Sequence, residues 1–187
     1  MLLDYASLEA KQIYKIMSQS VIPRPIAWIV TEDEGVINAA PFSYFTPLSS
    51  SPATLIVSIG HKEDTSPKDT LANIRKTKRA TICFVNKSNL EDMKKTSKSH
   101  SKDESEILVY DIDTSKILDD YPPLISSAQS AMFCELHTEV ELEGATKPLI
   151  LEIKSQYFKE ECIDNQLNIE LENISRVGKS FAKLEEI

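Results

Sequence analysis

Apolar and β-branched residues gather in short runs along most of the chain, and polar segments or segments containing Gly or Pro separate these runs. This pattern is typical of β-strands that bury at least one face. We expect strands over residues 26–31, 36–40, 54–60, 79–86, 132–142 and 148–158. The acidic segment 32–35, which ends in Gly35, predicts a tight hairpin turn between the first two strands.

Helical spacing of apolar residues predicts helices over residues 7–18, 68–78 and 89–95. Ser66-Pro67 is a plausible start for the second helix. Residues 96–106 contain no apolar side chain, which predicts a mobile surface loop. Several antiparallel strands at short spacing with a few helices favour a mainly β fold, an antiparallel Greek-key barrel, in one domain over residues 1–187.

Charge and glycine usage narrow the possible functions. The chain has 21 basic and 29 acidic residues, a net charge of -8, and its basic residues are scattered among acids. A nucleic-acid footprint needs a basic stripe, so we expect no nucleic-acid partner. The 4 glycines are isolated from one another, which excludes a Gly-rich loop that cradles a pyrophosphate.

The cysteines and histidines offer no metal site and no disulfide framework. The 3 cysteines, Cys83, Cys134 and Cys162, lie far apart, so we expect reduced thiols in the cytoplasm. The chain has no signal-peptide pattern at its start and no run of 18 apolar residues, so we expect no membrane partner. The 3 histidines also lie far apart in the chain, so the sequence predicts no metal site built from them.

Three segments place polar or unusual residues at the ends of predicted strands: residues 24–28, 38–45, and 58–60 with 66–74. In the third, Ser66, Lys68 and Thr70 at a helix start offer a cation, two hydroxyls and free amides, a site for one terminal phosphate. The alternative is structural: Ser66 is only the helix N-cap, Lys68 is solvated and Asp69 matches the helix dipole. Likewise, Pro41 would end a strand, and Trp28 would be a core or interface residue.

The blocks RPIAW, INAAPFSYF, SIG and SPKDTLANI follow in this order over residues 24–74. In residue identity, order and spacing, these blocks resemble the flavin reductase-like, flavoredoxin-type branch of the FMN-binding split-barrel family. The later half of the chain matches more weakly, through Pro122-Pro123, residues 130–142 and residues 176–178. The resemblance implies a split barrel that is homodimeric and holds FMN non-covalently at the subunit interface.

The resemblance also implies a set of cofactor-binding residues in these blocks. The isoalloxazine edge would meet Ala40, Pro41, Phe42 and Ser43. The ribityl chain would run beside Ser58, Ile59 and Gly60. The phosphate would lie near Lys68, Asp69 and Thr70, with Arg24 as a second cation, and Asn38 and Asn73 complete the set. The family pattern has Asn where this chain has Thr46, and a different aromatic ending where this chain has residues 179–181.

The implied activity is that of an FMN-dependent oxidoreductase that moves electrons from NAD(P)H to free flavin or to a redox partner protein. Flavin carries the chemistry, so no catalytic side chain is expected. The alternatives are an FMN-binding electron carrier or storage protein without a nicotinamide site, and a scaffold that has lost the cofactor. His61 is expected in an exposed loop or near the flavin, His100 in solvent, and His137 on a strand or at the substrate.

Overall fold

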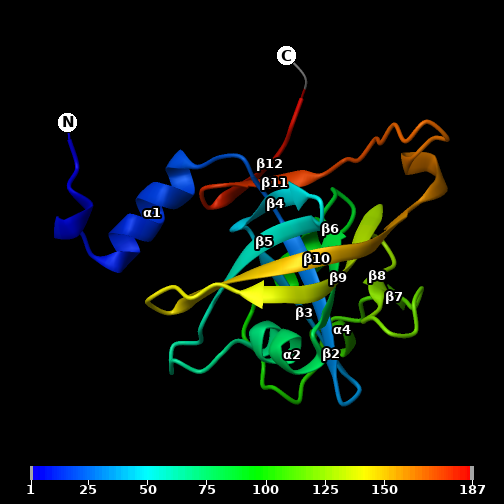
Figure 1. Cartoon of the computed structure of the whole chain (residues 1–187), viewed down its shortest axis with the longest axis horizontal. Helices are drawn as coiled ribbons and strands as arrows, with labels where there is room; N and C mark the ends of the chain where they lie inside the picture. Colours follow the sequence, from blue (N-terminus) through cyan, green and yellow to red (C-terminus); the bar gives the residue numbers. More distant parts are fainter. Residues whose placement is uncertain (1, 186–187) are drawn as a thin grey trace.

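A curled seven-stranded sheet forms the body of the protein in the computed structural model, which describes residues 2–185 (Figure 1). Its strand order is β3-β2-β6-β9-β10-β5-β4, and every neighbouring pair is antiparallel. Its strands are β2 (Ala27–Asp33), β3 (Val36–Phe42), β4 (Phe45–Ser50), β5 (Ala53–Gly60), β6 (Arg79–Phe84), β9 (Ser130–Glu139) and β10 (Thr146–Phe158). The predicted mainly β, antiparallel class is confirmed.

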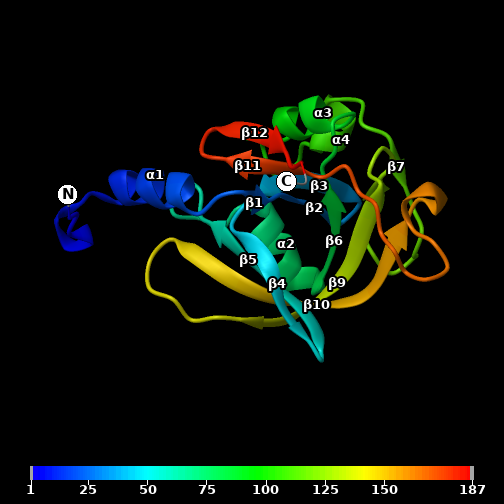
Figure 2. The same ribbon diagram turned by 90° about the horizontal axis from the view of Figure 1, so that it is seen from above.

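Smaller sheets and short helices surround this body. A three-stranded sheet joins β1 (Arg24–Pro25), β11 (Ile174–Val177) and β12 (Ser180–Lys183), and β7 (Thr114–Ser115) pairs with β8 (Leu124–Ile125). The helices are η1 (Tyr5–Ser7), α1 (Ala10–Ser20), α2 (Asp69–Thr77), α3 (Leu90–Lys95), α4 (Glu106–Val109) and η2 (Glu160–Cys162). Seen from above, the strands wrap around α2, whereas α1 projects from the body (Figure 2).

Alternation along β2 separates two hydrophobic clusters, one on each face of the sheet. Ala27 and Ile29 face the cluster that contains Leu71 and Ile74 of α2. Trp28, next to them in sequence, faces the cluster that contains residues of α3, α4 and β8. Trp28 is fully buried in this chain, so the core alternative for this residue is confirmed.

The hairpin between β2 and β3 confirms the predicted turn. Glu34 and Gly35 have φ of 51° and 82°, the left-handed geometry of a two-residue hairpin that glycine adopts without steric cost. The expectation that Pro41 ends the strand is wrong, because Pro41 pairs with Trp28 and β3 continues to Phe42. β3 is at the edge of the sheet, where a missing N–H costs no ladder hydrogen bond.

The helix starts differ from the predicted ones. The first helix begins at Ala10, where Glu9 and Gln12 form a reciprocal capping box. In α2 the N-cap is Lys68, not Ser66, whose amide and hydroxyl both bond to Asp64. The N-cap interpretation of Ser66 is therefore wrong, and the first turn of α2 has no side-chain cap.

The segment 96–106 is anchored to the body at both ends, whereas its middle lies on the surface. Thr96, Ser105 and Glu106 are buried within it, and Glu106 begins α4. The Trp28 indole donates to the Thr96 hydroxyl over 3.0 Å, and the Ser105 hydroxyl donates to the Ile37 carbonyl over 2.6 Å. The predicted surface position is therefore confirmed for residues 97–104, apart from the half-buried His100, and is wrong for Thr96, Ser105 and Glu106 at the two ends; the mobility of the segment stays a prediction.

The three cysteines are free thiols, and all are buried. Burial raises the pKa of Cys83 and of Cys134 to about 12, so neither is a reactive thiolate near neutral pH. None of the helices in residues 2–185 is long and apolar enough to cross a membrane. Over the same residues, no group of three His, Cys, Asp or Glu side chains is placed to hold a metal ion.

Candidate functional site

A cavity of about 560 Å³ opens between the end of β3, the start of α2 and the segment 96–106. This volume lies in the range of about 300–1,000 Å³ that is typical of small-molecule and cofactor sites. The residues that line it are Asn38, Ala40, Pro41, Phe42, His61, Lys62, Glu63, Asp64, Lys68, Asp69, Thr70, Thr96, Ser97, Lys98, Ser99, His100 and Glu106.

One corner of the cavity suits an anion. Lys68 lies 5.8 Å from the centre of the Phe42 ring, and none of the acids in the described residues forms an ion pair with it. Asp69 is neutralised by Lys62, whose ammonium lies 2.9 Å from the carboxylate. The first-turn amides of α2 have no intrahelical partner and point out of the helix end. Lys68, which has no ion pair within residues 2–185, and the open first turn of α2 thus line the same part of the cavity wall.

A buried polar network forms the floor of the cavity around Glu106. One carboxylate oxygen accepts from the Asn38 amide over 2.8 Å and the other from the Ala39 backbone N–H over 3.1 Å. The Asn38 carbonyl oxygen accepts from the Thr70 hydroxyl over 2.9 Å. Burial raises the pKa of Glu106. The nearby His100 opposes this upward shift, and Asp69 adds to it. The network connects β3, α2 and α4 directly beneath the cavity.

The segment after α3 forms the opposite wall. The Nε2 atom of His100 lies 2.9 Å from the Tyr110 hydroxyl, and the imidazole packs edge-on against the Tyr110 ring. Only 15% of its side chain is exposed, so the expectation that His100 lies in solvent is wrong. Lys98 lies 6.0 Å from the centre of the same Tyr110 ring and faces the cavity from this wall.

A second, smaller cavity of about 230 Å³ adjoins the first, with Pro41, Phe42 and Ser97 lining both. Its other lining residues come from β11, β12, α3 and the start of β2. They are Ile26, Ser43, Met93, Lys94, Arg176 and Phe181.

The structure gathers most of the predicted cofactor residues at these cavities. The larger cavity is lined by Asn38, Ala40, Pro41, Phe42, Lys68, Asp69 and Thr70, and the smaller one by Ser43. Five predicted residues line neither cavity: Arg24, Ser58, Ile59, Gly60 and Asn73. For these five, contact with a flavin stays a prediction.

The five have other partners in this chain. Arg24 is buried and donates to the backbone carbonyls of Ser18 and Val21, so its guanidinium caps the end of α1. Asn73 donates to the buried Thr31 hydroxyl over 3.0 Å. Ser58, Ile59 and Gly60 pair with β10, and His61, the next residue along the chain, does line the larger cavity.

Sequence reasoning missed Glu106 and the wall at 96–100. Glu106 lies 67 residues after Ala39 in the chain, and one acid in a polar stretch carries no local signal of burial. His61 is half-buried and lines the larger cavity, so the expectation of an exposed loop position is wrong, and its contact with a flavin stays a prediction. His137 lies on β9, 3.8 Å from the Glu152 carboxylate and away from both cavities.

Comparison with known proteins agrees with this fold. Residues 17–169 match the model of the flavin reductase like domain. The crystal structure of nitrilotriacetate monooxygenase component B from Bacillus cereus is 27% identical, has a TM-score of 0.93, and is matched over 100% of this chain and 96% of that one. The uncharacterized protein YwrF of Bacillus subtilis is 32% identical over 96% of this chain and 92% of its own length.

A further relative, the uncharacterized protein BH2278 of Halalkalibacterium halodurans, is 36% identical over 57% of this chain, and the match spans only 52% of that protein. The family model covers well over half of the chain. The protein therefore belongs to the flavin reductase-like family of split-barrel proteins, as its sequence blocks predicted. Membership of this family implies the use of flavin and oxidoreductase chemistry.

Proposed function

We propose that the protein is an NAD(P)H-dependent oxidoreductase that holds FMN non-covalently in the larger cavity. The observation that carries the proposal is the pairing of Lys68 with the open first turn of α2 at one end of a cavity that Pro41 and Phe42 wall. This donor set fits a single terminal phosphate, because one cation and one helix start supply its charge and hydrogen bonds. FMN has such a phosphate, whereas FAD has a pyrophosphate.

The side chains of this protein would bind, orient and shield the cofactor. Lys68 and the α2 amides would hold the phosphate, and the apolar wall of Ala40, Pro41 and Phe42 would keep water from the ring. When bound, the flavin supplies the redox chemistry by accepting a hydride from a nicotinamide and passing electrons on. Glu106 would hold the β3 wall in place through Asn38 and Ala39. No nucleophile or general base is required of the chain.

Anaerobic titration of the FMN-loaded protein tests this activity. We expect NADH or NADPH to bleach the visible flavin absorbance, and added free flavin or a redox partner to restore it. A protein that binds FMN but is bleached only by dithionite would be a carrier or storage protein. A protein that takes up no FMN would contradict both functions and support a scaffold without cofactor.

The projecting α1 supports the proposal of a homodimer. Apolar side chains at and after this helix are exposed in the single chain, including Tyr14 at 60% and Val21 at 62%. Leu48 on the edge strand β4 is exposed at 51%. Exposed apolar groups of this kind on an element that leaves the body favour burial against a second copy of the chain. The partner copy would then cover the face on which α1 projects (Figure 1).

Sedimentation of the purified protein tests the homodimer. We expect a dimer, and we expect the double substitution Tyr14→Ser with Val21→Ser to shift it toward a monomer because it removes apolar area from the contact. Ser substitutions at Leu142 and Leu167, which are also exposed, are the matched control and should leave the dimer intact. A monomeric parent protein that still retains FMN would contradict cofactor binding at a subunit interface.

A further inference from the structure

The smaller cavity is positively charged. Lys94 and Arg176 line it, and its lining within the described residues contains no acidic side chain. Arg176 also lies directly opposite Arg24 in the pairing of β11 with β1. Like charges in directly opposite positions of neighbouring strands are unfavourable. One terminal nitrogen of Arg24 donates to the carbonyls of Ser18 and Val21 at the end of α1, whereas none of the carboxylates in residues 2–185 forms an ion pair with Arg176.

Arg176 is held in place, and its terminal nitrogens have no hydrogen-bond partner within residues 2–185. Its Nε donates to the Gly178 carbonyl over 3.1 Å, and its guanidinium lies 4.4 Å from the centre of the Phe181 ring. Arg176 and Phe181 are register partners on β11 and β12, so the stacking is built into the hairpin. Lys94 approaches the same ring to 5.2 Å, and its single acidic partner is the exposed Glu91, at 2.7 Å. A cation fixed in this way loses little freedom when it binds an anion.

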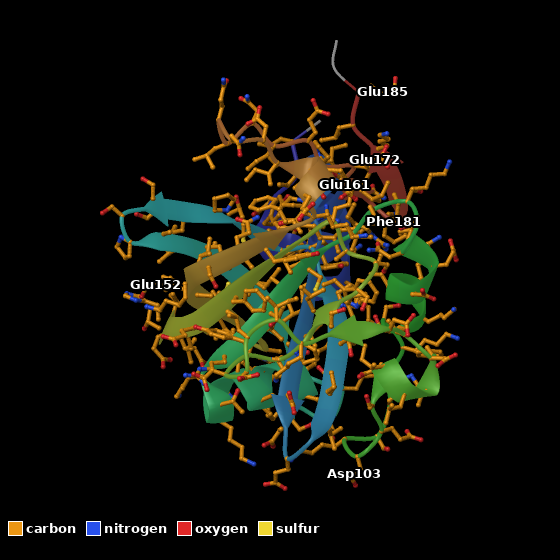
Figure 3. The ribbon with its side chains drawn as sticks, turned by 90° about the vertical axis from the view of Figure 1, so that its right-hand side faces the viewer. Asp103, Glu152, Glu161, Glu172, Phe181 and Glu185 are labelled. Atoms are coloured by element: carbon orange, nitrogen blue, oxygen red, sulfur yellow. The ribbon has the colours of Figure 1, made fainter. Side chains whose placement is uncertain are left out.

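Apart from Ser43 and Ser97, the rest of the cavity lining is apolar. Phe42 and Phe181 contribute rings, and Ile26 and Met93 contribute aliphatic surface. Phe181 lies on β12, the last strand of the chain, on the side of the molecule shown in Figure 3. The volume of about 230 Å³ is below the range of about 300–1,000 Å³ that is typical of sites for larger ligands. It accommodates a single substituted ring but not a flavin or a dinucleotide.

We propose that the smaller cavity binds a single-ring aromatic carboxylate, with the ring between Phe42 and Phe181 and the carboxylate at the free guanidinium nitrogens of Arg176. The planar guanidinium matches a carboxylate through two parallel hydrogen bonds, and Lys94 adds a second positive charge. Because Pro41 and Phe42 wall both cavities, the bound acid would be the neighbour of the flavin. The role of the acid as a second substrate rests on the proposed function, whereas its binding does not.

Calorimetric titration with benzoate tests the site in flavin-free and in FMN-loaded protein. We expect one benzoate per chain in both, and binding at least about tenfold weaker for benzyl alcohol, which lacks the charge, and for acetate, which lacks the ring. In the FMN-loaded protein, benzoate should also shift the flavin absorbance. A failure of FMN to bind would count against the proposed function only, since the flavin-free titration still reports on the cavity.

Two substitutions and a control distinguish benzoate binding at the smaller cavity from an effect of the protein's net charge. Arg176→Gln should weaken benzoate binding by at least about tenfold, and Lys94→Gln by a smaller factor. Lys183→Gln removes the same charge from β12 outside the cavity, where Lys183 pairs with Glu172, and should leave binding unchanged. Unchanged affinity in both Arg176→Gln and Lys94→Gln would overturn the proposal. So would equal binding of benzyl alcohol, or tighter, Arg176-dependent binding of nicotinamide mononucleotide at the same site.

Discussion

Lys68→Ala is expected to weaken FMN retention roughly tenfold to a hundredfold at low salt. A hydrogen bond to a charged group contributes about 1.5–3 kcal/mol, and Lys68 is the lysine at the anion-binding corner that forms no ion pair within the described residues. Part of this loss should disappear at high salt, because ionic strength screens the attraction in the parent protein. Equilibrium dialysis of FMN at two salt concentrations measures both effects.

Lys76→Ala is the matched control for this change. Lys76 lies on the same helix, near its C-terminal end, and pairs with Asp33 and Glu34. The substitution alters the net charge by the same amount but leaves the cavity untouched, so FMN retention should stay close to that of the parent protein. If Lys68→Ala retained FMN as well as Lys76→Ala does, Lys68 would be a solvated lysine and the phosphate would bind elsewhere.

Glu106→Ala is expected to destabilise the fold by about 2 kcal/mol or more and to weaken FMN retention as well. The substitution leaves the Asn38 amide and the Ala39 N–H buried without their acceptor, and an unsatisfied buried donor costs about 1–3 kcal/mol. The β3 wall, which includes Ala40 next to these two residues, loses two hydrogen bonds to α4 and keeps the one from Ser105 to Ile37. Urea unfolding and FMN dialysis measure the two effects separately.

The pH dependence of Glu106→Gln tests the buried charge itself. Burial raises the pKa of Glu106 above its ordinary value of 4.5, so ionisation of this group is easier in the unfolded chain. Its contribution to stability is therefore complete below pH 4.5 and is lost as pH rises through the raised pKa. The free energy of unfolding of the parent protein, minus that of Glu106→Gln, should fall over this window and then level off.

Asp103→Asn provides the control, because Asp103 is exposed at the tip of the same segment (Figure 3). Its difference from the parent protein should be nearly independent of pH over the same window. A difference curve for Glu106→Gln that rises with pH would mean that hydrogen bonds to the ionised carboxylate outweigh its desolvation. That result would contradict the raised pKa.

The local sequence pattern was sufficient to predict features whose conformation depends on residues that are neighbours in the chain. The alternation of Trp28 with its neighbours placed it on one face of β2, and the glycine at position 35 permitted the left-handed turn. The prediction of a phosphate site at the start of α2 rests on residue types that are adjacent in the chain. The predicted N-cap, Ser66, lies only a short distance before the observed N-cap, Lys68. The Ser66 hydroxyl donates to Asp64 instead of capping the helix.

Local pattern failed where a polar residue finds its partner far along the chain. Residues 96–106 have the composition of a solvated loop, yet Thr96 accepts from Trp28 and Glu106 from Asn38, each 68 residues away in sequence. Arg24, which the family resemblance places near the phosphate, donates to the carbonyls of Ser18 and Val21 close by in the chain, and its contact with a flavin stays a prediction.

The sequence by itself determined six of the seven strands of the main sheet, the antiparallel class and the family, because these depend on short-range periodicity and on residue blocks that are contiguous in the chain; the edge strand β4 was missed. Only the tertiary structure decided what surrounds the cavities. Glu106 and His100 reach the larger one, and Arg176 and Phe181 reach the smaller one, through the curling of the sheet and the return of the C-terminal hairpin. The reason is physical: a buried charge is tolerable only beside its hydrogen-bond partners, and long-range folding alone supplies them.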